Sequence, residues 1–246
     1  MMNPRDRIVF PLDVPTIDEA LRWVDRLKDL VGVFKVGFEL YTSCGPKVIE
    51  EIKKRCNNKI FLDLKLNDIP NTVLRTIRVA SNLGVDWITV HALSGAESLK
   101  SAVSAAYNNL KILAVTVLTS LERADLMELG FNAELVREVK DLVLRLTKIA
   151  YKAGCDGIVC SAKETSQIKE VYPELFTVVP GIRLEGARKD DQVRVVTPYE
   201  AILSGADYLV IGRPIREAFS PEKTCIEIAE EIEKALAQKN QNKDSG

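Results

Sequence analysis

The feature that most constrains this fold is a strand pattern followed by a helical pattern, repeated along nearly the whole chain. The strand patterns are short runs rich in β-branched and aromatic residues at 7–14, 33–39, 59–66, 87–92, 111–119, 157–161, 176–182 and 208–215. The helical patterns occupy 16–30, 46–56, 70–83, 95–107, 133–153, 163–171, 198–204 and 221–237. Strands that alternate with helices are typical of βαβ units in a parallel sheet. Eight such units predict an α/β protein with a single-domain (β/α)8 TIM barrel.

An open, doubly wound sheet is the alternative architecture for the same units. Two features favour a closed barrel: no G-x-G-x-x-G follows the first strand pattern, and charged residues recur at the carboxyl ends of the strand patterns. We expect residues 1–237 to form the barrel domain. Residues 238–246, QKNQNKDSG, contain no apolar side chain to bury, so we expect a disordered C-terminal tail.

Charge and hydropathy exclude several classes of function. Lys plus Arg total 34 against 35 for Asp plus Glu, and a net charge of -1 provides no broad field for binding nucleic acid or an anionic membrane. No apolar run approaches the roughly 18 residues of a membrane span, and the N-terminus lacks the apolar core of a signal peptide. We therefore expect a soluble, cytoplasmic protein.

The cysteines and the histidine limit the available chemistry. Five cysteines form an odd number without a C-x-x-C pair, which predicts reduced thiols rather than a disulfide or zinc framework. His91 is the only histidine, so a His-based metal centre or a Ser-His-Asp triad is not expected. We interpret His91 as a packed, hydrogen-bonded side chain. Any catalysis must then use carboxylates and amines.

The third strand pattern, 59–66, carries charges inside an apolar run. Asp63 and Lys65 are two residues apart, so their side chains point to the same face of a strand. Asp68 follows, and Pro70 suits the first turn of a helix. The result is an Asp-x-Lys-x-x-Asp motif at the carboxyl end of a buried strand. Because buried charges are costly unless paired, a purely structural ion pair is the simplest alternative to a catalytic site.

The barrel prediction places further polar residues at the same rim. TIM-barrel enzymes build their sites at the carboxyl ends of the strands. Besides the third strand, five strand patterns end in or lead to candidate residues: Asp13, Lys35, Thr119, Pro180 with Arg183, and Gly212 with Arg213. A chance set of core charges would not gather at one end, which favours a functional site.

Part of this rim predicts an anion site. Gly212 and Arg213 lie where the eighth strand pattern turns toward the last helix; glycine lets backbone N–H groups approach a phosphate, and arginine adds a bidentate donor. Barrels often bind phosphate after strands seven and eight. The polar segment 183–198 suits a lid, in which Gln192 donates to the phosphate.

The motifs together resemble those of the orotidine 5′-monophosphate decarboxylase family. The resemblance extends from residue 7 to about residue 219, with D-x-K-x-x-D-I-P-N-T as its most specific part. The other matching motifs are LDV with Asp13, FKVG with Lys35, TVLTS with Thr119, VPGIR with Arg183, DQVRVVTP with Gln192, and IGRPI with Gly212 and Arg213.

The resemblance implies an activity and an assembly. Orotidine 5′-monophosphate (OMP) would be converted to uridine 5′-monophosphate (UMP) and CO2, the last step of de novo pyrimidine synthesis, without a metal ion or other cofactor. It also implies a homodimer in which Asp68 reaches the partner's site. Lys65 would protonate C6 of the pyrimidine, flanked by Asp63 and the partner's Asp68, with Lys35 pairing Asp63. The implied substrate-binding residues are Asp13, Lys35, Asp63, Ile69, Thr72, Thr119, Pro180, Arg183, Gln192, Gly212 and Arg213.

Three alternative functions remain open from the sequence. Related magnesium-dependent sugar-phosphate enzymes share D-x-K-x-x-D but are expected to carry an acid on the second strand, where this chain has Lys35. A Schiff-base aldolase needs a neutral lysine, whereas acidic neighbours keep Lys65 charged. A non-catalytic phosphosugar-binding barrel has no need of the interlocked Lys and Asp set.

Overall fold

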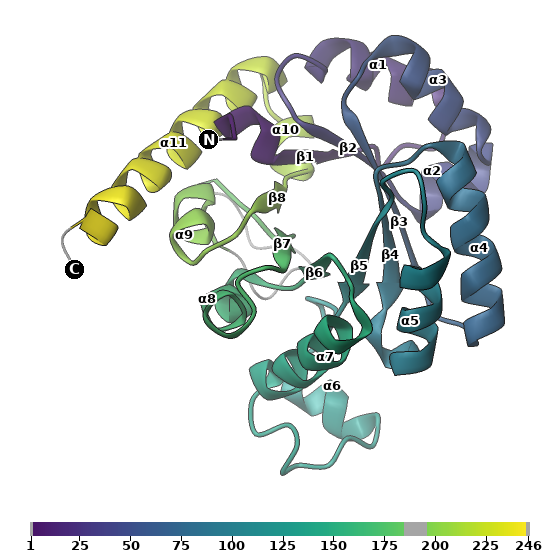
Figure 1. The fold of residues 1–246 in the computed structure, drawn as a ribbon. Coiled ribbons are helices and arrows are strands. Elements are labelled where there is room, and N and C mark those ends of the chain that lie inside the picture. The colour runs from purple at the N-terminus through teal and green to yellow at the C-terminus, as the bar shows by residue number, and fades with distance from the viewer. Residues whose placement is uncertain (1, 185–195, 245–246) are drawn as a thin grey trace.

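Eight parallel strands form a closed barrel in the order β1 to β8, and β1 pairs with β8 to complete it (Figure 1). The structure is a computed structural model that describes residues 2–184 and 196–244. The strands are Ile8–Pro11 (β1), Val33–Val36 (β2), Lys59–Leu66 (β3), Trp87–His91 (β4), Lys111–Val115 (β5), Gly157–Val159 (β6), Phe176–Val179 (β7) and Tyr208–Val210 (β8). The predicted (β/α)8 TIM barrel is confirmed, and the open-sheet alternative is wrong.

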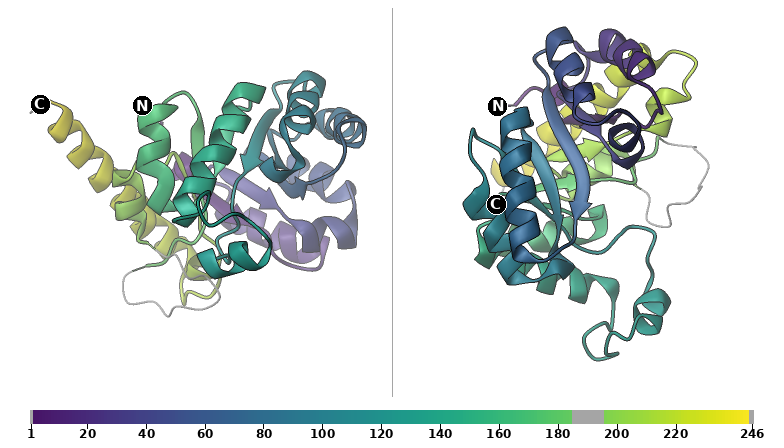
Figure 2. Two further views of the ribbon diagram at one scale, coloured as in Figure 1. Left: turned by 90° about the horizontal axis from the view of Figure 1, so that it is seen from below. Right: turned by 90° about the vertical axis from the view of Figure 1, so that its right-hand side faces the viewer.

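Helices surround the barrel and connect successive strands (Figures 1 and 2). They are Ile17–Leu27 (α1), Phe38–Cys44 (α2), Lys47–Arg55 (α3), Pro70–Leu83 (α4), Ala96–Ala105 (α5), Arg123–Glu128 (α6), Val139–Ala153 (α7), Ala162–Val171 (α8), Pro198–Leu203 (α9), Arg213–Arg216 (α10) and Pro221–Asp244 (α11). Short 3-10 turns lie at Pro4–Arg7 (η1) and Ala92–Ser94 (η2). None of the helices in these described ranges is long and apolar enough to cross a membrane.

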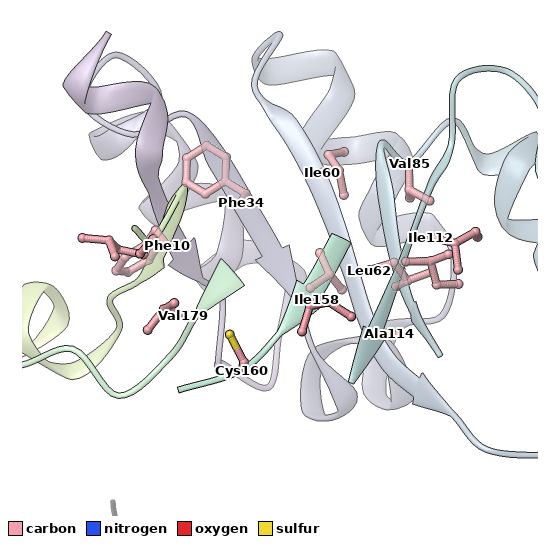
Figure 3. Packing of buried hydrophobic residues seen from close by; sticks show 14 of the residues in the cluster. Phe10, Phe34, Ile60, Leu62, Val85, Ile112, Ala114, Ile158, Cys160 and Val179 are labelled. Carbon is pink, nitrogen blue, oxygen red and sulfur yellow. The ribbon is translucent and has the colours of Figure 1, made fainter. Parts of the chain in front are cut away.

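Alternation along the strands separates two cores. Side chains such as Phe10, Phe34 and Leu62 are fully buried in the layer between the strands and the helices (Figure 3). The residues one position before or after them point into the barrel, because strand side chains alternate faces. Those interior residues form a second cluster: Val9, Val33, Phe61, Trp87, Leu113, Val178 and Tyr208.

The interior cluster fills the amino-terminal half of the barrel and thereby positions the site above it. Trp87 packs against Tyr208 and Phe61, with ring centroids 4.6 and 5.7 Å apart. Two residues further along the same strands, the side chains turn polar: Lys35 on β2, Asp63 on β3 and Thr89 on β4 follow Val33, Phe61 and Trp87. These polar side chains therefore lie directly above the apolar layer, toward the carboxyl ends of the strands.

Apart from β3, which spans the predicted residues 59–66, the observed strands are shorter than the apolar runs that predicted them. β1 ends at Pro11 although Leu12 and Val14 are also buried, so burial of the following loop extends the apolar run beyond the strand. The predicted second strand included residues 38–39, which instead begin α2. At the end of the chain, α11 continues to Asp244, so residues 238–244 of the predicted disordered tail are helical. Gln and Lys are good helix formers, and no Pro or Gly interrupts residues 238–244.

Candidate active site

A cavity of about 510 Å³ opens where the strands end at their carboxyl termini. The side chains of β2 and β3 form one wall, and the segments that follow β1, β5, β7 and β8 form the others. The structure brings nine of the residues singled out from the sequence to this cavity: Asp13, Lys35, Asp63, Lys65, Thr119, Pro180, Arg183, Gly212 and Arg213.

The end of β3 departs from regular strand geometry where the two charges lie. The pairing of β3 with β4 shifts register between Leu62 and Leu66, and Lys65 has a φ of 42°. A positive φ is uncommon for a residue other than glycine and costs about 1–3 kcal/mol. The Lys65 N–H finds a side-chain acceptor instead of a ladder partner, donating to Thr89 Oγ1 at 2.8 Å. This irregularity sets the direction in which the Lys65 ammonium leaves the strand.

Asp63 is the buried centre of the charged side chains. Lys65 Nζ donates to Asp63 Oδ2 at 2.8 Å, and Thr89 Oγ1 donates to Asp63 Oδ1 at 3.0 Å. Lys35 Nζ lies 3.6 Å from Asp63 Oδ2 and 3.4 Å from Asp13 Oδ1. Burial raises the pKa of Asp63, but the charges of Lys35 and Lys65 and the two hydrogen bonds outweigh it, so the pKa lies below its ordinary value. Asp63 is therefore an anion held between two cations.

The wall formed by the segments after β7 and β8 is rich in arginine. Gly212 lies between β8 and α10, and a Cβ added there would lie 2.8 Å from Pro11 Cγ, so glycine allows the chain to pass close to β1. Arg213 follows at the start of α10, and Arg183 enters from the segment after β7. With Lys35 and Lys65, these arginines give the cavity a surplus of positive charge.

Three of the predicted residues lie outside the cavity within this chain. Asp68, Ile69 and Thr72 are exposed at the turn into α4, and the Asp68 carboxylate accepts the N–H of Ile69 at 2.7 Å. Asp68 and Ile69 line a separate surface hollow of about 580 Å³. Gln192 and most of the predicted lid lie outside the described residues.

Sequence reasoning missed two polar residues. Thr89 is fully buried and bonds to both Asp63 and Lys65; its signal was a single hydroxyl in the otherwise apolar run WITV of β4. Arg216 lines the cavity from α10, but an arginine one turn after another arginine carries no distinguishing pattern.

His91 ends β4, and its Nδ1 accepts the N–H of Leu93 at 3.3 Å. Burial, reinforced by the charge of Lys65, lowers the pKa of His91.

The described side chains that line the cavity do not form a suitable set of metal ligands. Within residues 2–184 and 196–244, no group of three or more His, Cys, Asp or Glu side chains is placed to hold a metal ion. The two carboxylates that line the cavity in the described part of the chain, Asp13 and Asp63, both face Lys35. A divalent cation between them would meet the Lys35 ammonium, so this donor set does not fit a metal ion.

Thr89 provides a test of the local structure. Thr89→Val is expected to lower the free energy of unfolding by about 2–3 kcal/mol, because it leaves Asp63 Oδ1 and the Lys65 N–H without the hydroxyl that satisfies both. Urea unfolding measures the change. Thr89→Ser keeps the hydroxyl and is the matched control, with a loss of about 1 kcal/mol or less. If the two variants were equally stable, the Thr89 hydroxyl would not stabilise the irregular end of β3.

Comparison with known proteins shows similarity over most of the chain. Residues 6–228 match the Orotidine 5′-phosphate decarboxylase / HUMPS family. A protein named orotidine 5′-phosphate decarboxylase from Gloeothece citriformis is 45% identical over 233 residues, covering 92% of this chain and 98% of the relative. Another of that name from Desulfosudis oleivorans is 44% identical over 237 residues, covering 95% of each.

Solved structures agree with the sequence relatives. The crystal structure of orotidine 5′-phosphate decarboxylase from Lactobacillus acidophilus has a TM-score of 0.77 and 32% identity, covering 92% of this chain and 98% of that one. Orotidine 5′-monophosphate decarboxylase from Methanocaldococcus jannaschii, complexed with the inhibitor BMP, has a TM-score of 0.72 and 28% identity, with the same coverage.

Proposed function

Because the chain belongs to the orotidine 5′-phosphate decarboxylase / HUMPS family, as the D-x-K-x-x-D-I-P-N-T motif predicted, we propose that it is a carboxy-lyase that converts OMP to UMP and CO2 in pyrimidine biosynthesis. The observation that carries the proposal is the row of alternating charges formed by Asp13, Lys35, Asp63 and Lys65 in the cavity. A purely structural ion pair would not require four ionised side chains around an open space.

The charge of the cavity fits this substrate. Among the described residues, its lining holds five cationic side chains and two carboxylates, which leaves a net charge of +3: Lys35, Lys65, Arg183, Arg213 and Arg216 against Asp13 and Asp63. OMP carries a phosphate monoester with a charge between about -1.5 and -2 at neutral pH and a carboxylate with a charge of -1. The cavity therefore matches both anionic groups of the substrate.

The reaction requires a fixed cation. When the bond between C6 and the carboxyl carbon breaks, CO2 leaves and the electron pair stays on C6 in a vinyl-type orbital, which the π system of the ring cannot delocalise. The Lys65 ammonium, paired with Asp63 at 2.8 Å, stabilises that electron pair and then transfers its proton to C6. Two unit charges 4 Å apart gain about 4 kcal/mol at an effective dielectric constant near 20.

The remaining residues orient the substrate. Asp13 and Lys35 bind the ribose hydroxyls, while Gly212, Arg213 and Arg183 hold the phosphate together with Gln192. Thr119 contacts the pyrimidine, and Pro180 packs beside the carboxyl group. Binding energy from the phosphate and ribose holds C6 near Lys65, which lowers the barrier by fixing the reacting geometry.

A homodimer completes the site in this proposal. Asp68 is exposed and lies outside the cavity of its own subunit, so it contributes to the reaction only if it enters the cavity of a partner. There it would lie beside the partner's Lys65, with Ile69 and Thr72 near the base. That lysine would then be flanked by two carboxylates, Asp63 of its own subunit and Asp68 from the other.

Insensitivity to chelators separates this proposal from a magnesium-dependent reaction. In an ultraviolet absorbance assay with OMP, kcat is expected to stay the same in excess EDTA, because Lys35 occupies the place between Asp13 and Asp63 that a metal would need. Loss of turnover on chelation, restored by Mg²⁺, would contradict the metal-independent mechanism. Binding of UMP without any turnover of OMP would instead identify a non-catalytic phosphosugar-binding barrel.

A further inference from the structure

The row of charges has a fifth member on α10. Arg216 Nη1 donates to the backbone carbonyl of Asp13 at 3.1 Å and lies 4.0 Å from Asp13 Oδ2. Asp13 in turn faces Lys35, which faces Asp63. The charges therefore alternate from Arg216 to Lys65 across the whole cavity.

Within the described ranges, Lys35 and Arg216 pair with the Asp13 carboxylate. Asp13 lies beyond the end of β1 and its side chain is 44% exposed. The ion pair with Lys35 holds one carboxylate oxygen at 3.4 Å, a long contact for a charged hydrogen bond. Arg216 adds a hydrogen bond to the backbone carbonyl of the same residue, which restrains the loop independently of the rotamer of the carboxylate. It acts beside the hydrogen bond from the Leu12 N–H to the Lys35 carbonyl at 2.9 Å.

α10 is well placed to supply this restraint. The helix begins at Arg213, directly after Gly212, so the segment that holds the phosphate also carries Arg216. The Arg216 side chain is 27% exposed and lines the cavity. A single short helix thus connects the arginine wall with the loop after β1.

We propose that Arg216 is a positioning residue: it holds Asp13 in place for the ribose hydroxyls of the nucleotide and thereby keeps Lys35 aligned between Asp13 and Asp63. The inference rests on the proposed function, because it concerns the nucleotide that Asp13 binds. It assigns Arg216 to the ribose end of the site through Asp13, and not to direct contact with the phosphate.

The binding of UMP by Arg216→Met tests the proposal without depending on turnover. Methionine keeps an apolar stem of similar length but removes every donor, so the Kd for UMP, measured by titration calorimetry, is expected to rise about tenfold, the usual effect of losing one hydrogen bond to a charged group. Arg216→Lys retains a positively charged hydrogen-bond donor and is expected to recover most of the affinity. Arg26→Met removes an arginine that pairs with Glu222 at 2.8 Å outside the cavity lining, and is expected to leave the Kd unchanged.

A double-mutant cycle distinguishes positioning from direct phosphate binding. In an Asp13→Ala background, Arg216→Met is expected to change the Kd by less than about twofold, because the carboxylate that it positions is absent. With OMP, the single variant is expected to raise KM about tenfold while kcat stays within about twofold, the pattern of lost uniform binding.

Two results would overturn the proposal. A full tenfold effect of Arg216→Met that persists in the Asp13→Ala background would assign Arg216 to the phosphate, and an unchanged Kd in the single variant would assign it no role. Failure of the wild type to turn over OMP would overturn the proposed function instead, while the UMP titrations would still decide the role of Arg216.

Discussion

Lys65→Ala is expected to reduce kcat for OMP by about 10⁴-fold or more, because the variant loses both the general acid and the cation that stabilises charge at C6. Each of these contributions alone is usually worth about 10²- to 10⁴-fold. Binding of UMP should change far less, since the phosphate and ribose contacts remain. Loss of absorbance at saturating OMP gives kcat, and titration calorimetry gives the affinity for UMP.

Lys59→Ala is the matched control for this experiment. Lys59 begins the same strand, but its Nζ lies over the rings of Trp87 and Tyr208, 5.6 and 5.8 Å from their centroids, outside the cavity lining. Its removal is expected to leave kcat within about twofold, as for most substitutions remote from a site. A Lys65→Ala enzyme that kept more than a tenth of wild-type activity would remove Lys65 from the mechanism.

The alternation that predicted the barrel also predicted that nine of the candidate residues meet at the cavity. In a parallel barrel all carboxyl ends lie at one rim, so residues as distant in sequence as Asp13 and Arg213 could be placed together before any contact was known. The period of two within β3 placed Asp63 and Lys65 on one face. These predictions depend only on strand direction and side-chain alternation, which residue types specify well.

The parts that sequence patterns did not predict depend on local backbone geometry. Lys65 has a positive φ in a segment that reads as an ordinary strand, and the bulge depends on a hydroxyl supplied by the neighbouring strand, Thr89. α2 begins directly after β2, although FKVGFE continues the apolar pattern. Arg216 acts on the loop after β1 across nearly the full length of the chain, and no local periodicity reports such a contact.

Asp68→Ala is expected to reduce kcat by about 100-fold or more, because the lysine that protonates C6 loses one of its two flanking carboxylates. The effect would act across a dimer, since Asp68 is exposed and lies outside its own cavity. Mixing this variant with Lys65→Ala tests the assignment. In a heterodimer one site combines an intact Lys65 with the partner's intact Asp68, while the other site lacks both.

Random exchange between equal amounts of the two variants makes half of the dimers heterodimers, so the mixture is expected to recover about one quarter of wild-type activity. Mixing Lys65→Ala with Asp63→Ala is the control: Asp63 and Lys65 lie 2.8 Å apart in one subunit, so no heterodimer contains a complete site with both substituted positions intact. Tagged subunits that copurify verify exchange. A shared site must regain activity in every heterodimer that brings an intact Lys65 and an intact Asp68 together across the interface. If exchange is complete and only background activity remains in the first mixture, Asp68 therefore does not act on the partner's lysine.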